Sequence, residues 1–159
     1  YDYDPEVSKK IADNGIYVDP TLALSHLNRI RGREAPNSGA MRDPALRFEI
    51  LRDMWDKGIK FVTGMDSGMA NANFDDFAYI PQVMVEEMGI SPLEAITCST
   101  RTSSECLGMD NEIGTLEEGK SADVLIIEGD PSRDISALHN VNTIVCKGKL
   151  IKKAGTLLI

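Results

Sequence analysis

The sequence predicts an α/β fold in which strands alternate with helices and a small all-β module follows. Up to about residue 109, two apolar strand-like runs lie among helical segments, which is typical of a parallel sheet with crossover helices. From Ile113 onward the pattern changes to short β-branched runs bounded by turn residues. Lys147-Gly148 lies between two of these runs and indicates a tight hairpin. We therefore predict two parts, residues 1–109 and residues 110–159.

Capping residues and apolar periodicity indicate the helices of the first part. Asp4 followed by Pro5 is typical of a helix start, and Ser91-Pro92-Leu93-Glu94 is a capping box with proline at the first helical position. Helices are expected over Pro5–Asn14, Pro44–Lys57, Asp75–Met88, Ser91–Thr100 and Thr102–Leu107. The apolar faces of the second and third should contain Leu46, Ile50, Leu51 and Met54, and Phe77, Ile80, Met84 and Met88.

The first part holds only two clear strands, Ile16–Val18 and Ile59–Thr63. Two parallel strands can neither close a barrel nor bury both faces of a sheet. The pattern therefore indicates that further strands belong to this sheet. Between the two strands, the polar and Arg-rich stretch Ser25–Arg42 predicts a long loop, with a helical start as the alternative.

In the second part, strands are expected at Val124–Glu128, Asn142–Cys146 and Lys149–Lys152. The first of these should pair beside the hairpin that the other two form. The segment Gly114-Thr115-Leu116-Glu117-Glu118-Gly119-Lys120-Ser121 matches the pattern of a phosphate-binding loop. Such a loop opens a helix, whereas a strand signal follows here, so we interpret the match as accidental.

Composition excludes several classes of function. The 25 acidic residues outnumber the 17 basic ones, and a formal net charge of -8 disfavours contact with a phosphate backbone, so no nucleic-acid partner is expected. No apolar run approaches the roughly 20 residues of a membrane span, and no secretory signal is visible. Three widely spaced cysteines argue against a disulfide framework, so we expect a cytoplasmic location.

The order of these pieces resembles the C-terminal region of the amidohydrolase superfamily. The resemblance rests on a strand ending in Gly-x-Asp-Ser-Gly, then SPLEAITCSTRTSSECLGM, NEIGTLEEGKSADVLIIEGDP and VNTIVCKGKLIKKAG. It covers about Pro5 to Gly155, and the nearest branch contains imidazolonepropionase and the Xaa-Pro dipeptidases. It implies the last strands of a (β/α)8 TIM barrel plus part of the adjoining β-sandwich. Ile16–Val18 would be the seventh strand and Ile59–Thr63 the eighth.

The resemblance also implies a zinc site, to which Asp66 would contribute as metal ligand and catalytic proton acceptor. The histidine ligands and the carboxylated lysine or glutamate of the family match no residue here, because His26 and His139 fall outside the ligand positions. Met65 also departs from the usual Thr or Ser before the Asp. One carboxylate does not hold zinc usefully, so we expect no tightly bound metal and no activity in this chain alone. The other interpretation of Asp66 is a strand-ending turn residue.

Other candidate residues are weaker. Ser67 and the segment Met69–Asn73 could contact substrate or only shape the loop. Arg29, with Arg31 and Arg33, could grip a substrate carboxylate, although a solvated basic loop is the simpler interpretation. His26 and His139 are expected on the surface, at a loop or helix and at a turn. Cys98 and Cys106 should be small core residues rather than nucleophiles, and Trp55 should pack against the sheet.

These observations lead to two hypotheses. The chain is part of a zinc-dependent hydrolase of amide or cyclic amide C–N bonds in a small-molecule or dipeptide-like substrate. Its partner would then be the missing N-terminal portion of the enzyme. Alternatively, it is a non-catalytic module derived from such an enzyme that self-associates through exposed sheet edges. An unrelated α/β binding domain would not explain the order of the motifs.

Overall fold

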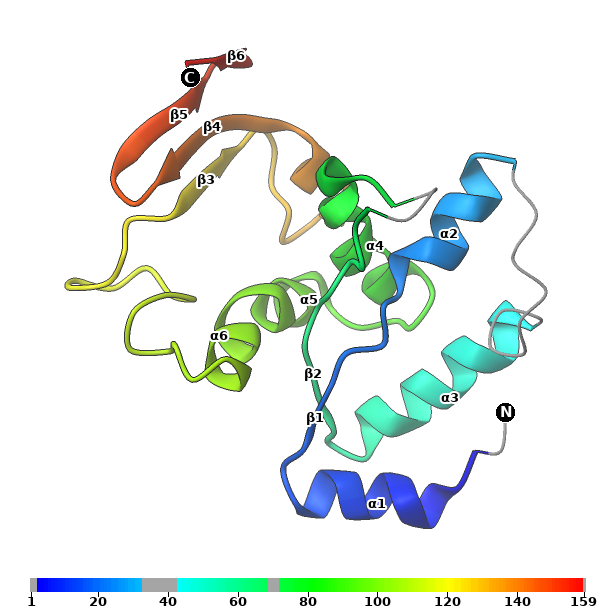
Figure 1. Ribbon diagram of the computed structural model, residues 1–159. Helices are drawn as coiled ribbons and strands as arrows, with labels where there is room; N and C mark the ends of the chain where they lie inside the picture. The colour runs from blue at the N-terminus through cyan, green and yellow to red at the C-terminus, as the bar shows by residue number, and fades with distance from the viewer. Residues whose placement is uncertain (1–2, 33–42, 69–71, 159) are drawn as a thin grey trace.

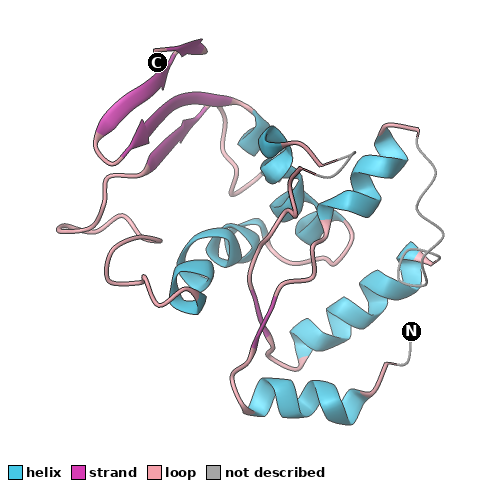
Figure 2. Ribbon diagram, viewed as in Figure 1, coloured by secondary structure: helices cyan, strands magenta, loops and turns pink. Residues whose placement is uncertain are grey.

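The computed structural model describes residues 3–32, 43–68 and 72–158 (Figure 1). It contains a two-stranded parallel sheet among helices and a four-stranded antiparallel sheet at one end of the molecule (Figure 2). In the parallel sheet, β1 (Tyr17–Val18) pairs with β2 (Lys60–Phe61) in the register Tyr17↔Lys60 and Val18↔Phe61. Both strands lie inside the predicted runs but are shorter. The predicted α/β class is therefore confirmed, while no closed barrel is formed by the described residues.

The helix before β1 begins and ends where its capping residues predict. Helix α1 (Pro5–Asp13) starts after Asp4, whose carboxylate accepts a hydrogen bond from the backbone N–H of Glu6. The helix closes at Asn14, and Gly15 then adopts a positive φ of 63° that favours glycine. The chain can thus turn directly into β1.

The stretch predicted as a long loop is helical over its first part. Helix α2 (Ala23–Ile30) starts without a side-chain cap, and its residues Leu24, His26, Leu27 and Asn28 are buried. The alternative prediction, a helical start to this stretch, is therefore confirmed for residues 25–30. The cause is tertiary, because burial against neighbouring helices stabilises a segment whose local signals are weak. The remainder of the predicted loop, residues 33–42, lies outside the described residues.

Helix α3 (Pro44–Asp56) packs its apolar face against the parallel sheet. Trp55 meets the ring of Phe61 on β2 edge-on, with ring centroids 6.0 Å apart, which confirms the prediction that Trp55 packs on the sheet. The buried face differs from the prediction, since Phe48 and Leu51 are buried whereas Leu46 is exposed. An apolar residue at the first turn of a helix can remain outside a contact that begins further along.

The helices after β2 form two groups. A 3-10 turn η2 (Phe74–Ala78) leads into α4 (Tyr79–Glu86), where Ile80 and Met84 are buried as predicted and Phe77 is exposed. The second group comprises α5 (Pro92–Thr97), the π-helical turn η3 (Cys98–Thr102) and α6 (Ser103–Cys106). The two helices predicted here thus follow each other through a π-turn.

The capping box at Ser91 and the π-turn have clear structural roles. The hydroxyl of Ser91 accepts from the N–H of Glu94, and the Glu94 carboxylate accepts from the N–H of Ser91. After the π-turn, the Ser103 hydroxyl donates to the carbonyl of Cys98 and accepts from the N–H of Thr63 at the end of β2. The helix is thereby fixed to the strand that precedes the candidate site.

The second part forms an antiparallel sheet in the order β3-β4-β5-β6, which confirms the predicted pairing. Its strands are β3 (Val124–Ile127), β4 (Val141–Cys146), β5 (Lys149–Lys153) and β6 (Thr156–Leu157), the last of which was not predicted. Lys147 and Gly148 both have positive φ values, 49° and 76°, as a tight hairpin requires. The short 3-10 helix η4 (Ile135–His139) connects β3 to β4. The phosphate-loop pattern lies in turns before β3, which agrees with its interpretation as accidental.

The core lies between the parallel sheet and the helices. Its largest fully buried apolar side chains come from the start of α2, from β2 and from α4: Leu22, Leu27, Phe61, Ile80, Val83 and Met84. Of the two cysteines expected in the core, Cys98 is buried and Cys106 is exposed. None of the described helices is long and apolar enough to cross a membrane.

Candidate functional site

The carboxylate of Asp66 lies beyond the carboxyl end of β2, where ligands gather in parallel α/β folds. Its side chain is exposed and its backbone adopts φ 53°, in the left-handed region that non-glycine residues rarely occupy. Such a conformation costs about 1–3 kcal/mol and persists only where its surroundings enforce it. Asp66 therefore occupies a turn that the fold specifies, and the candidate carboxylate faces solvent.

Strand pairing divides the sheet into two faces. Phe61 packs on Trp55 and so points to the helices, whereas the ammonium of Lys60 lies 5.2 Å from the ring centroid of Tyr17 on the opposite face. Asp19 follows β1 and Gly64 follows β2, and the carboxylate of Asp19 lies directly against Gly64. Two carboxylates, those of Asp19 and Asp66, thus follow the ends of neighbouring strands.

Asp19 was not singled out from the sequence, and the structure places it against Gly64. A Cβ atom added to Gly64 would lie 1.9 Å from Oδ2 of Asp19, so the missing side chain makes room for the carboxylate. Oδ1 of Asp19 accepts a hydrogen bond of 3.0 Å from the N–H of Thr21, which has a φ of 46°. The only sequence signal was the Asp-Pro pair that ends β1. The contact with Gly64 joins residues 45 positions apart, so the local sequence around either residue does not predict it.

Arg47 on α3 holds the loop after β1. Its guanidinium donates to the carbonyl of Pro20 and, at 3.3 Å, to the carbonyl of Thr21. A third hydrogen bond of 3.1 Å reaches the hydroxyl of Ser25 on α2. One rigid donor group therefore fixes the path from the end of β1 into α2. Sequence reasoning missed this residue, because nothing in the periodicity of α3 distinguishes it from a solvated arginine.

The predicted substrate contacts lie apart from one another. Ser67 follows Asp66 directly and is partly buried, while Arg29 is on α2 and pairs with Glu87, the residue that caps the end of α4. Arg31 pairs with the buried Asp76 of η2 at 2.5 Å. These pairings show that both arginines connect helices, and substrate binding by Ser67 or Arg29 stays a prediction. Arg33 and residues 69–71 of the predicted Met69–Asn73 segment lie outside the described residues.

The residues that the structure describes do not fit a complete metal site. Within residues 3–32, 43–68 and 72–158, no group of three or more His, Cys, Asp or Glu side chains is placed to hold a metal ion. Asp66 can supply one oxygen ligand, and a metal needs several ligands in fixed geometry. Any metal bound beside Asp66 would need ligands from outside this set.

Cys98 has the environment of a structural thiol. It is buried, and this burial, followed by the negative charge of Glu94, raises the pKa of the thiol to about 11. A thiol protonated at neutral pH is a poor nucleophile. The prediction that Cys98 is a core residue is confirmed, and Cys106 differs because it lies on the exposed side of α6.

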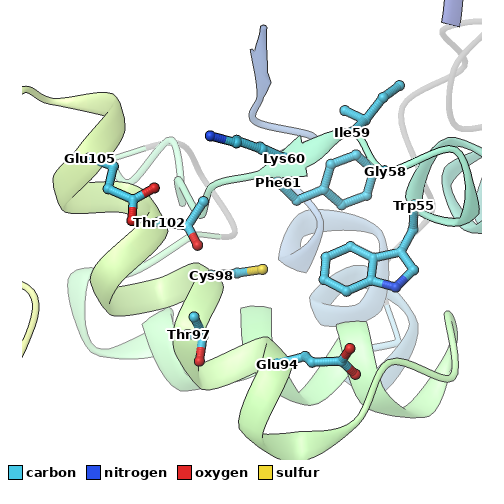
Figure 3. Close-up of a pocket in the computed structure, with 10 residues that line it drawn as sticks. All are labelled: Trp55, Gly58, Ile59, Lys60, Phe61, Glu94, Thr97, Cys98, Thr102 and Glu105. Atoms are coloured by element: carbon cyan, nitrogen blue, oxygen red, sulfur yellow. The ribbon is translucent and has the colours of Figure 1, made fainter. Parts of the chain in front are cut away.

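A separate cavity of about 310 Å³ lies beside β2, between α3 and the α5–α6 helices (Figure 3). Trp55 and Phe61 form one wall, and Cys98, Thr102 and Glu105 belong to the facing helices. Neither Asp19 nor Asp66 is among its lining residues. The cavity is thus distinct from the strand ends that carry the candidate carboxylates.

Comparison with known proteins connects this arrangement to one family. The model of the amidohydrolase family matches residues 2–151. Imidazolonepropionase from Thermoplasma volcanium is 30% identical over 89 residues, which are 56% of this chain and 22% of that protein. The 5-methylthioadenosine/S-adenosylhomocysteine deaminase of Thermoanaerobacter pseudethanolicus is 28% identical over 172 aligned positions, covering 90% of this chain and 40% of that protein.

Solved structures agree. A Xaa-Pro dipeptidase with bound methionine in its active site superposes with a TM-score of 0.79 at 25% identity, covering 94% of this chain and 37% of that one. The ochratoxinase of A. niger gives a TM-score of 0.75 at 26% identity, over 96% of this chain and 35% of that one. The chain thus spans two fifths or less of the length of these four proteins.

Proposed function

Because the chain belongs to the amidohydrolase family, we propose that it is the C-terminal part of a metal-dependent hydrolase that cleaves amide or cyclic amide C–N bonds. The observation that carries the proposal is the placement of Asp66, an exposed carboxylate at the carboxyl end of a strand that pairs in parallel with its neighbour. Relatives named as a deaminase and a dipeptidase support hydrolysis as the reaction class.

The chemistry expected of Asp66 is proton transfer. In C–N hydrolysis a water molecule attacks the carbon, and the departing nitrogen must gain a proton. A carboxylate beside that water can accept its proton and deliver it to the nitrogen, a contribution of about 10²–10⁴ in rate. Zinc, as the family resemblance implies, would make the water more acidic when bound. The solvent exposure and fixed turn of Asp66 suit this role.

The partner that we propose is the N-terminal portion of the same enzyme. It would extend the β1–β2 sheet and supply the remaining ligands around Asp66, with a small molecule or dipeptide-like compound as substrate. The three cysteines are free in the structure, which supports a reducing, cytoplasmic location.

A second candidate function is a non-catalytic module that self-associates. The antiparallel sheet favours it, because Leu125, Ile126 and Leu157 are all more than half exposed. Under this alternative the apolar sheet surface would be covered by another copy. The two proposals differ in whether addition of the N-terminal portion restores hydrolysis.

Reconstitution tests the proposal. The chain alone, after chelation and reloading with zinc, should hold less than one metal per chain and hydrolyse no amide substrate. Mixing or fusing it with the upstream portion of its own gene product should give metal uptake and hydrolysis of a panel of dipeptides and cyclic amides. Asp66→Ala should then reduce kcat by at least about 100-fold while circular dichroism shows an unchanged fold.

The matched control is Asp110→Asn, which changes an exposed carboxylate in a turn away from β2. This variant should keep full activity in the reconstituted enzyme. Tight binding of one metal by the chain alone would refute the requirement for other ligands. A reconstituted enzyme that retains its activity in Asp66→Ala would refute the catalytic role of Asp66.

A further inference from the structure

Both histidines of the chain lie against the same tyrosine, although they are 113 residues apart. The ring centroid of His26 on α2 is 5.6 Å from that of Tyr79 on α4, and the ring of His139 in η4 is 4.4 Å from it. The sequence predicted two unrelated surface histidines. His26 is instead buried with 7% of its surface exposed, which corrects that prediction, and His139 is exposed as expected.

The hydrogen bond to His26 determines its protonation state. Nη2 of Arg29 lies 3.2 Å from Nδ1 of His26. A guanidinium only donates, so Nδ1 must present its lone pair as the acceptor. The ring is therefore neutral and carries its proton on Nε2. Protonation of Nδ1 would break this hydrogen bond and bring two N–H groups and two positive charges together.

His139 meets a different partner. Its Nε2 lies 2.7 Å from Oε1 of Gln82, an amide oxygen that only accepts. The ring of His139 therefore donates from Nε2 to a neutral side chain, whereas the ring of His26 meets a guanidinium.

His26 is adjacent to the contacts that join the loops near Asp66. The same Nη2 of Arg29 that meets His26 also donates to Glu87, linking α2 to α4, and Arg31 links the end of α2 to Asp76 in η2. Helix α2 follows β1, and η2 follows the turn at Asp66. Arg29 therefore bonds both the imidazole of His26 and the carboxylate of Glu87, while Arg31 makes the link from α2 to η2.

We propose that His26 is a proton-sensitive latch, whose neutral imidazole holds Arg29 in place between α2 and α4 and whose protonation loosens α2 from the rest of the fold. The charged groups facing His26 are Arg29 on its own helix, Glu86 and Glu87 on α4, and His139 in η4. Arg47 of α3 bonds the neighbouring Ser25. The latch is a property of this chain and does not depend on the proposed catalytic function.

The electrostatic environment supports this proposal. Burial is the largest influence and, with the positive charge of Arg29, lowers the pKa of His26 below its ordinary value of 6.5, although Glu86 and Glu87 act in the other direction. A lowered pKa means that the unfolded or opened chain binds the proton more readily. The contribution of the latch is therefore complete above pH 6.5 and is lost as the pH falls through the pKa of the folded state.

Nuclear magnetic resonance of the full chain tests the latch. Long-range ¹H–¹⁵N spectra at pH 7.5 should show His26 protonated on Nε2 alone, and a titration should give it a pKa below the ordinary value of 6.5. Hydrogen exchange, corrected for intrinsic rates, should show that protection of the α2 amides falls by up to about tenfold per pH unit below 6.5. The α1 amides provide the internal reference and should keep their protection.

Two variants separate the latch from general acid sensitivity. His26→Gln keeps an acceptor for Arg29 and does not titrate, so α2 should remain protected at pH 5. His139→Gln should leave the acid-dependent loss in α2 unchanged. A proton on Nδ1 of His26 at pH 7.5, or equal loss of α2 protection in wild type and His26→Gln, would overturn the proposal. If His26→Gln does not fold, the wild-type tautomer and titration still decide it.

Discussion

All members of the buried core cluster lie between Leu22 and Cys98, whereas the strands β3–β6 contribute no fully buried apolar side chain among the described residues. Among the described residues of the second part, only Ile135 and Ala137 of η4 are buried apolar residues. The first part therefore has a core of its own, although its sheet has two strands in the part of the chain that the structure describes. The strands of the antiparallel sheet pair in the order β3-β4-β5-β6, and their residues are half-buried or exposed.

The two sheets of this chain therefore differ in how far their side chains are buried. The helices around β1 and β2 cover the face that carries Phe61, so burial stabilises that region. The β3–β6 sheet leaves Leu125, Ile126 and Leu157 more than half exposed, and since Leu125 and Ile126 are consecutive on β3, both faces of the sheet carry exposed apolar side chains. A further segment or another chain would therefore add more stability by covering this sheet than by contacting the core of the first part.

Truncation of one large apolar residue in each region should reveal the difference most strongly. Phe61→Ala removes a side chain with 0% exposure and should lower the free energy of unfolding by about 3–5 kcal/mol. Leu125→Ala, at 58% exposure, should change it by less than about 0.5 kcal/mol. Urea denaturation followed by circular dichroism measures both. Similar losses in the two variants would mean that the sheet is as well buried as the core, and the comparison would fail.

An ion pair in the first part should give the next largest effect. Asp76, with 6% of its side chain exposed, accepts from Arg31 and from the N–H of Asn73, so Asp76→Asn should cost about 2–3 kcal/mol. The exposed neighbour Asp75→Asn is the control and should be nearly neutral. The same urea titrations, performed at neutral pH, give both values.

The effect of Asp76 should also depend on pH. Burial is the largest single influence and acts to raise its pKa, but the hydrogen bonds from Arg31 and Asn73 and the nearby positive charges hold the pKa below 3.8. Its contribution to stability is complete above pH 3.8 and lost as the pH falls through the lower, folded value. The difference between wild type and Asp76→Asn should therefore shrink in this acid range. A constant difference would indicate that the charge of Asp76 contributes nothing.

Alanine substitutions at two glycines test the packing contact between the second part and the first. Gly114 and Gly119 have similar φ values, 93° and 90°, so alanine strains the backbone at both. A Cβ at Gly114 would lie 2.1 Å from the hydroxyl oxygen of Ser104, whereas none of the described atoms lies within 4 Å of one at Gly119. Gly114→Ala should thus destabilise by about 2 kcal/mol more than Gly119→Ala. Equal melting temperatures of the two variants would show that the contact between Gly114 and Ser104 can rearrange without loss of stability.

The smallest effect concerns local hydrogen bonds. Ser91→Ala removes the cap of α5 in the first part and should cost about 1 kcal/mol. Ser132→Ala removes an exposed hydroxyl that bonds to Asp130 in a loop of the second part, and its effect should be close to zero. Differential scanning calorimetry resolves the two. A larger loss for Ser132→Ala would show that this loop contributes more to the second part than its exposure indicates.

The elements that were predicted well are those whose signals are local. Asp4 and Ser91 cap helices at the predicted residues, and Lys147-Gly148 forms the predicted hairpin, because each depends on hydrogen bonds or dihedral angles within a few residues. Helix α2 was predicted only as an alternative to a loop, because it lacks a side-chain cap and is stabilised by packing. Leu46 was misplaced because helical periodicity does not reveal how far a helix extends past its contact.

The candidate site shows the same division. The sequence by itself determined that Asp66 follows a strand, that strands and helices alternate before a β module, and that the order of motifs resembles the amidohydrolase superfamily. Only the tertiary structure decided that Asp19 fits against Gly64, that Arg47 holds the loop after β1, and that His26 accepts a hydrogen bond as a neutral ring. The physical reason is distance along the chain, since capping and turn formation use neighbouring residues. Burial, contacts between helices and the protonation of a buried ring depend on groups that meet only when the chain has folded.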